Sequence, residues 1–186
     1  MTKSSTLIPD THIDILRKLR GSQLQSFGTA HPLGVSRTAI GEVFIETDKN
    51  KVVLITSHLR SYEINGVIDD FASISIRRGD RSIVESASTK GGRYLDFSDS
   101  VITNLGIIRV EFIRTTSGRP WPSCVIDLGI VMETAIGRIA IFNGSIWVNE
   151  LDVDVFNDDV ELGAFDGFAS DVDDVWESRI SVVKIV

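Results

Sequence analysis

The chain has 186 residues and a mass of 20.5 kDa, which suits one domain large enough to bury most of the apolar surface that its unfolded form exposes. Apolar residues make up 42% of it and charged residues 24%, a composition that excludes a disordered chain. The formal net charge of −7 argues against nucleic-acid binding, because nucleic-acid-binding surfaces are basic.

Residues 1–9 are polar, and we expect them to form a flexible N-terminus before a single β-rich domain over 10–186. They lack the apolar core of about 7 to 15 residues that a signal peptide needs. No run in the chain approaches the roughly 18 apolar residues that span a bilayer. We therefore expect a soluble, cytoplasmic protein without a membrane partner.

The first predicted element is a helix over residues 10–20. Pro9 and Asp10 form a start signal, apolar residues recur at three-residue steps, and Gly21 follows a basic last turn. After it the period changes to two, in runs rich in Val, Ile, Phe and Thr, which is typical of strands. Strands are predicted at 39–47, 51–57, 72–77, 82–86, 107–114, 124–134, 138–142, 146–156 and 179–186.

Capping signals predict two more short helices, at residues 98–105 and 174–177. The strand spacing fits antiparallel hairpins. The fold class expected is therefore mainly β: an antiparallel β-sandwich or a barrel-like sheet, with an N-terminal α-helix and one or two short helices.

An offset of 87 residues aligns residues 44–47 (Phe-Ile-Glu-Thr) with residues 131–134 (Val-Met-Glu-Thr). Two similar halves, about 39–77 and 126–160, would pack face to face as a sandwich or close as a barrel. Alternating β sequences also align by chance, so both explanations stay open.

The sequence lacks the familiar catalytic signatures, including the nucleophile elbow, the phosphate-binding and dinucleotide-binding loops, H-E-x-x-H and C-x-x-C. Cys124 lies in an alternating apolar segment, so we interpret it as a small buried hydrophobe. His12, His31 and His58 show no paired spacing and are interpreted as unrelated imidazoles. We therefore predict no catalytic residue, no metal ligand and no cofactor.

The charge is concentrated in residues 149–178, named here the acidic stretch, which carry eleven carboxylates and no Lys or Arg. The 148 residues before it hold 17 basic and 15 acidic side chains, and the last eight residues hold two basic ones. Such an anionic segment attracts cations and basic proteins and repels nucleic acid. Its candidate partner-binding residues are Asp152, Asp154, Asp158, Asp159, Glu161, Asp166, Asp171, Asp173 and Asp174.

Three interpretations of the acidic stretch stay open: a protein-binding surface, a solvated segment that keeps the protein soluble, and an irregular calcium site. The calcium site would use Asp158, Asp159, Glu161 and Asp166, since hard cations take several carboxylate oxygens. An EF-hand is excluded, because both of its registers place an apolar side chain at a ligand position and lack the required Gly.

Trp121 is a further candidate for contact with a partner. It stands between two prolines, and a stiff loop presents a ring at low entropic cost. Packing of this ring against its own hairpin is the alternative.

Two function classes follow. The first is a non-catalytic protein-binding module that neutralises a basic partner; in size, charge and missing catalytic motifs it is similar to the immunity-type inhibitors of bacterial toxins. The second is a β-domain that binds a small ligand, a carbohydrate or Ca²⁺ at a loop-borne site. Salt separates them, because binding through the acidic stretch weakens as ionic strength rises.

Overall fold

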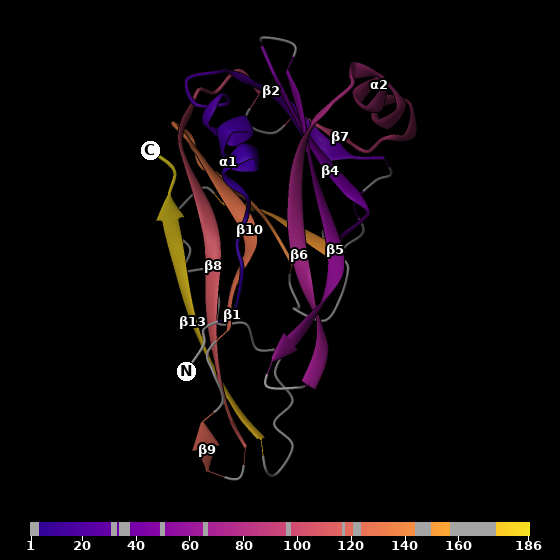
Figure 1. Cartoon of the computed structure of the whole chain (residues 1–186). Helices are drawn as coiled ribbons and strands as arrows, with labels where there is room; N and C mark the ends of the chain where they lie inside the picture. Colours follow the sequence, from indigo (N-terminus) through magenta and orange to yellow (C-terminus); the bar gives the residue numbers. More distant parts are fainter. Residues whose placement is uncertain are drawn as a thin grey trace.

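The computed structural model describes residues 4–30, 33, 38–48, 51–64, 67–95, 98–116, 118–120, 124–143, 150–156 and 174–186. These residues form two β-sheets and two helices in a sandwich-like arrangement, which confirms the predicted mainly β class and its N-terminal helix (Figure 1). Neither helix in the described ranges has the length and apolar character needed to cross a membrane.

The large sheet has the strand order β13-β8-β10-β11-β12-β3, with β1 beside β10 and β9 beside β8. Its strands are β1 (Ser4–Thr6), β3 (Thr38–Ile40), β8 (Ile102–Thr116), β9 (Arg119–Pro120), β10 (Cys124–Thr134), β11 (Arg138–Phe142), β12 (Glu150–Phe156) and β13 (Asp174–Lys184). Strand β1 lies within the N-terminal segment expected to be flexible, and it pairs in parallel with β10, Ser4 opposite Cys124. The antiparallel partner β11 occupies the other half of the same edge of β10, from Gly129 to Glu133.

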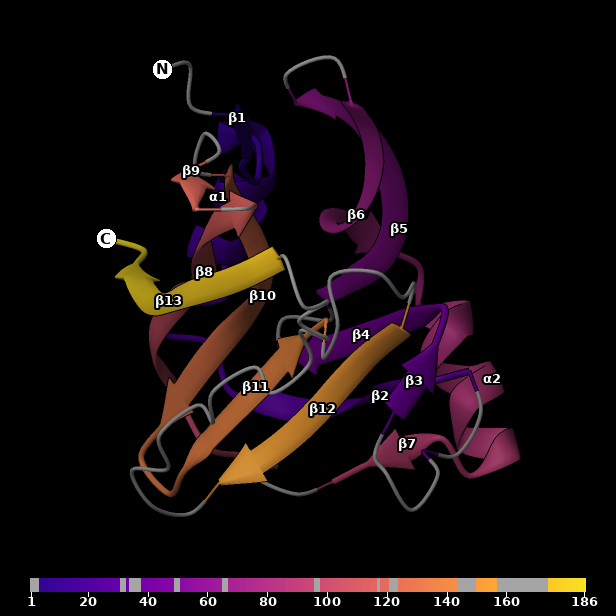
Figure 2. The same ribbon diagram turned by 90° about the horizontal axis from the view of Figure 1, so that it is seen from below.

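The small sheet has the order β6-β5-β4-β2-β7. Its strands are β2 (Leu24–Thr29), β4 (Glu42–Thr47), β5 (Val52–Ile64), β6 (Val67–Gly79) and β7 (Arg93–Tyr94). Strands β5 and β6 form a long hairpin that curves away from the rest of the sheet (Figure 2). The chain crosses from the large sheet to the small sheet at Gly41, which lies between β3 and β4 and has a φ of +100°. The predicted strand 39–47 is therefore divided into two strands at this residue.

Helix α1 (Asp10–Arg17) is the predicted N-terminal helix, ending three residues before the predicted end because the chain turns after Lys18. Helix α2 (Arg81–Lys90) shows that the predicted strand 82–86 was wrong. Asp80 caps its start by accepting a hydrogen bond from the Ser82 amide at 2.8 Å, and Gly91, at φ +77°, ends it. These two caps, rather than an apolar period, define the helix.

The helices predicted at 98–105 and 174–177 were also wrong. Residues 102–105 begin β8, and residues 174–177 begin β13, where Asp174 lies opposite Thr116. Strands β8 and β13 stay paired from there to Lys184 opposite Gly106. A continuous ladder of this length outweighs local capping signals, which contribute only about 0.5–2 kcal/mol.

The main core lies between the sheets, and α1 closes its upper end in Figure 1. Leu16 of α1 packs there with Ile45 and Ile76 of the small sheet and Ile130 and Ile141 of the large sheet, all fully buried. A second cluster joins Phe71 of β6 to β8 and β10, and a third covers the outer face of the small sheet with α2. Both helices are therefore held by apolar contacts with the strands.

The two segments that align at an offset of 87 residues each contain an antiparallel three-stranded meander, β4-β5-β6 and β10-β11-β12. Their first turns differ by one residue, since Glu46 lies opposite Val52 whereas Glu133 lies opposite Arg138. Internal duplication stays a hypothesis.

Candidate functional site

The acidic residues proposed for partner binding are only partly within the described ranges. Asp152 lies in β12 opposite Phe142 and Thr38, Asp154 lies opposite Ala140, and Asp174 begins β13. Leu151 and Val153, which alternate with the first two, are buried in the main core, as the strand pattern predicted. The remaining candidates lie outside the described residues: Asp158, Asp159, Glu161, Asp166, Asp171, Asp173 and Trp121.

Strands β12 and β13 carry the two ends of the acidic stretch and belong to the same sheet. They are separated by β8, β10 and β11, so Asp152 and Asp174 do not lie on neighbouring strands. The acids at the two ends of the stretch therefore do not form one site within the sheet.

A buried ion pair joins two strands of the large sheet. Asp127 of β10 lies directly opposite Arg109 of β8, and Arg109 donates to both carboxylate oxygens at 2.6 and 3.1 Å. The same carboxylate accepts a hydrogen bond from the backbone amide of Ile8 at 2.8 Å. The hydrogen bond from Arg109 to Asp127 is the main cause that raises the pKa of the guanidinium. This ion pair was not predicted from the sequence. Its one signal there was Asp127 itself, a charged residue within the apolar run that begins at Cys124.

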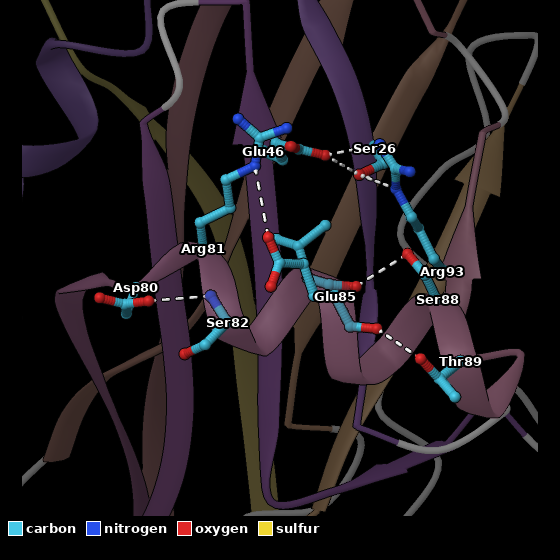
Figure 3. A network of polar contacts seen from close by, with 10 residues as sticks. Ser26, Glu46, Asp80, Arg81, Ser82, Glu85, Ser88, Thr89 and Arg93 are labelled. Carbon is cyan, nitrogen blue, oxygen red and sulfur yellow. Dashed lines mark hydrogen bonds and ion pairs between the residues drawn. The ribbon is translucent and has the colours of Figure 1, made fainter.

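A second buried ion pair lies in the small sheet. Arg93 of β7 donates to Glu46 of β4 at 2.8 Å and to the Ser26 hydroxyl of β2 at 2.9 Å, and Ser26 donates to Glu46 at 2.6 Å. Figure 3 shows these three side chains pointing toward one another beside α2. Glu46, Ser26 and Arg93 thus satisfy one another's hydrogen bonds, which explains why a carboxylate is tolerated at the buried position 46.

Cys124 is the small buried hydrophobe that the alternating pattern predicted. It is 5% exposed and packs with Phe71 and Phe112. Burial raises the pKa of its thiol to about 11. The thiolate needed for nucleophilic chemistry is therefore scarce at neutral pH.

Two of the three histidines lie within the described residues, and each accepts a hydrogen bond from a different partner. The Ile76 amide donates to Nδ1 of His12 at 3.3 Å, and Arg60 donates to Nε2 of His58 at 2.8 Å. Burial, then the charges of Arg60 and His12, lower the pKa of His58. His31 lies outside the described residues. Within the described part of the chain, no three His, Cys, Asp or Glu side chains gather in a way that could hold a metal ion.

A pocket of about 300 Å³ opens between α1, the start of β5 and the end of β6. Ile15, which is half-buried, contributes accessible apolar surface to it, and Lys18, Lys51 and Arg78 contribute positive charge. Leu19, Val52 and Val53 also line it but are buried. Named here the basic pocket, it was not predicted, because its three cations are far apart in the sequence and belong to no motif.

Comparison with known proteins adds no family: no family model matches the chain, and neither curated proteins nor solved structures give a match.

Proposed function

We propose that this chain is a protein-binding module without catalytic activity, and that its acidic stretch binds a basic protein in the manner of an acidic, immunity-type inhibitor. The observation that carries the proposal is the separation of charge: eleven carboxylates without a Lys or Arg in residues 149–178, against a nearly balanced body. Charge of one sign in one segment accelerates association with a partner of the opposite sign.

The placement of the flanking strands supports this proposal. Both ends of the acidic stretch belong to paired strands, β12 and β13, so the segment is joined at each end to the large sheet. Two carboxylates of the body that the structure places at buried positions, Asp127 and Glu46, are already bonded to arginines inside the fold. The acidic stretch, with eleven carboxylates and no Lys or Arg, is therefore a better candidate than these two residues for charge directed at a partner.

The test replaces Asp158, Asp159, Asp173 and Asp174 together by Asn. We expect the variant to fold. Its association rate with a basic partner captured from host lysate at low salt should fall at least about tenfold, because electrostatic steering is reduced. Capture and release by salt are compared with Ca²⁺ present and with chelator present.

The matched control removes the same amount of charge from the body by the substitutions Asp10→Asn, Glu42→Gln, Glu85→Gln and Asp99→Asn. We expect the control to associate nearly as fast as the wild type. Equal rates for both quadruple variants would reject a specific role of the acidic stretch and leave net charge as the cause. Capture that requires Ca²⁺ would favour the calcium site instead.

A further inference from the structure

The basic pocket has a charge opposite to that of the whole protein. The chain carries a net charge of −7, yet Lys18, Lys51 and Arg78 line this pocket, and none of the described residues that line it is acidic. Like charges gathered around one cavity repel one another, and an anion between them relieves that repulsion.

We infer that the basic pocket binds a small organic anion, in which a carboxylate or phosphate group is joined to an apolar moiety. This inference does not rest on the proposed protein partner, because the pocket uses residues of α1, β5 and β6 and none of the acidic stretch.

The three cations of the pocket differ in whether they already have a hydrogen-bond or ion-pair partner in the protein. Lys51 donates to the backbone carbonyl of Lys18 at 3.1 Å and so satisfies the C-terminal end of α1. Lys18 and Arg78 have exposed side chains and, within the described part of the chain, no ion pair. These two side chains are therefore free to turn toward a bound anion.

The acids nearest in sequence do not line the pocket, and each makes a contact elsewhere. Asp14 pairs with Arg17 at 2.7 Å, and Asp48 accepts a hydrogen bond from the Gln23 amide at 3.0 Å. Asp80 follows the pocket residue Gly79 but caps α2. No carboxylate of the described residues therefore lies in the wall of the pocket, where an anion would bind.

The shape and surface of the pocket restrict the ligand further. A volume of about 300 Å³ is at the lower end of ordinary ligand pockets, so it fits a small molecule. The accessible side chain of Ile15 favours a ligand with a small apolar part over a bare inorganic ion.

The test uses phenyl phosphate as the probe, with hexanoate, inorganic phosphate and phenol in parallel titrations at constant ionic strength. Binding is followed by the amide NMR shifts of Leu19, Val53 and Gly79. We expect phenyl phosphate or hexanoate to bind more tightly than both inorganic phosphate and phenol. The double variant Lys18→Gln/Arg78→Gln should weaken this binding about tenfold or more, since charge-assisted hydrogen bonds are lost.

The control variant Lys90→Gln/Lys184→Gln removes two exposed cations from α2 and β13 and should bind as the wild type does. Urea denaturation checks that both double variants fold. Phenol binding as tightly as phenyl phosphate, unchanged affinity in Lys18→Gln/Arg78→Gln, or an absence of shifts at millimolar probe would each overturn the inference. If Lys18→Gln/Arg78→Gln loses anion binding but still captures a basic protein, the result supports an anion site in the basic pocket and does not affect the proposed function.

Discussion

The buried ion pairs of the two sheets use the same chemistry but hold different parts of the molecule together. In the large sheet, Asp127 is fully buried and bonds both Arg109 and the amide of Ile8, which is 119 residues away in the sequence. In the small sheet, Glu46 is 7% exposed and its bonds to Arg93 and Ser26 stay within three neighbouring strands. One carboxylate therefore anchors a distant segment, whereas the other attaches a two-residue strand.

The largest effect is expected from Asp127→Ala. The substitution leaves the Arg109 guanidinium and the Ile8 amide without their partner, so we expect the free energy of unfolding to fall by about 3–5 kcal/mol. Urea denaturation measures this loss. The control is Glu42→Ala, which breaks the more exposed pair with Arg77 and should cost about 0–1 kcal/mol. Equal losses in both variants would mean that the buried pair contributes no more than a surface pair.

Glu46→Ala should cost less, about 1–3 kcal/mol, because Glu46 bonds only two side chains, whereas Asp127 also satisfies the buried backbone amide of Ile8. We expect its effect to be local: hydrogen exchange should accelerate at Arg93 and Tyr94 of β7 more than in β10. The comparison between the sheets fails if Glu46→Ala destabilises the protein as much as Asp127→Ala, or if exchange accelerates equally in both sheets.

Gly41→Ala tests the crossing between the sheets. Its φ of +100° is one that L side chains rarely adopt, so we expect a loss of about 1 kcal/mol. Hydrogen exchange should accelerate in both β3 and β4. Gly118→Ala, at φ +74° in the turn before β9, is the control, since its effect should stay in the large sheet. Exchange confined to one sheet in Gly41→Ala would contradict a coupling of the sheets at this residue.

The smallest effect concerns His58, which lies on β5 of the small sheet. Its pKa in the folded protein is lowered from 6.5, so the unfolded chain takes up the proton first as pH falls. The stability that neutral His58 contributes is therefore complete above pH 6.5 and is lost as pH falls through the lower, folded-state pKa. His58→Gln should flatten this part of the pH dependence of the urea midpoint. An unchanged slope would assign the pH dependence to other groups.

The strands of the large sheet show how much of the fold could be predicted. Strands β10 and β11 begin and end where the alternating pattern placed them, because buried β-branched residues at a period of two are a strong local signal. Strand β2 was missed, since Gln25, Ser26 and Gly28 interrupt its apolar pattern. Helix α2 was missed because its sequence is rich in Ser and Thr, and only its two ends carry helical signals.

The candidate sites divide in the same way. The acidic stretch is visible in the sequence, because a charge excess within 30 consecutive residues needs no fold to be recognised. The basic pocket is not visible there, because Lys18, Lys51 and Arg78 come from separate elements.

Local residue patterns were thus enough to predict a mainly β chain, its N-terminal helix and the burial of Cys124, since alternation and helical spacing act over a few neighbours. Strand pairing decided the rest: that residues 174–177 extend a sheet, that Arg109 meets Asp127, and that Arg93 meets Glu46. These contacts join residues far apart in the chain, and their energies depend on burial that exists only after the sheets have packed.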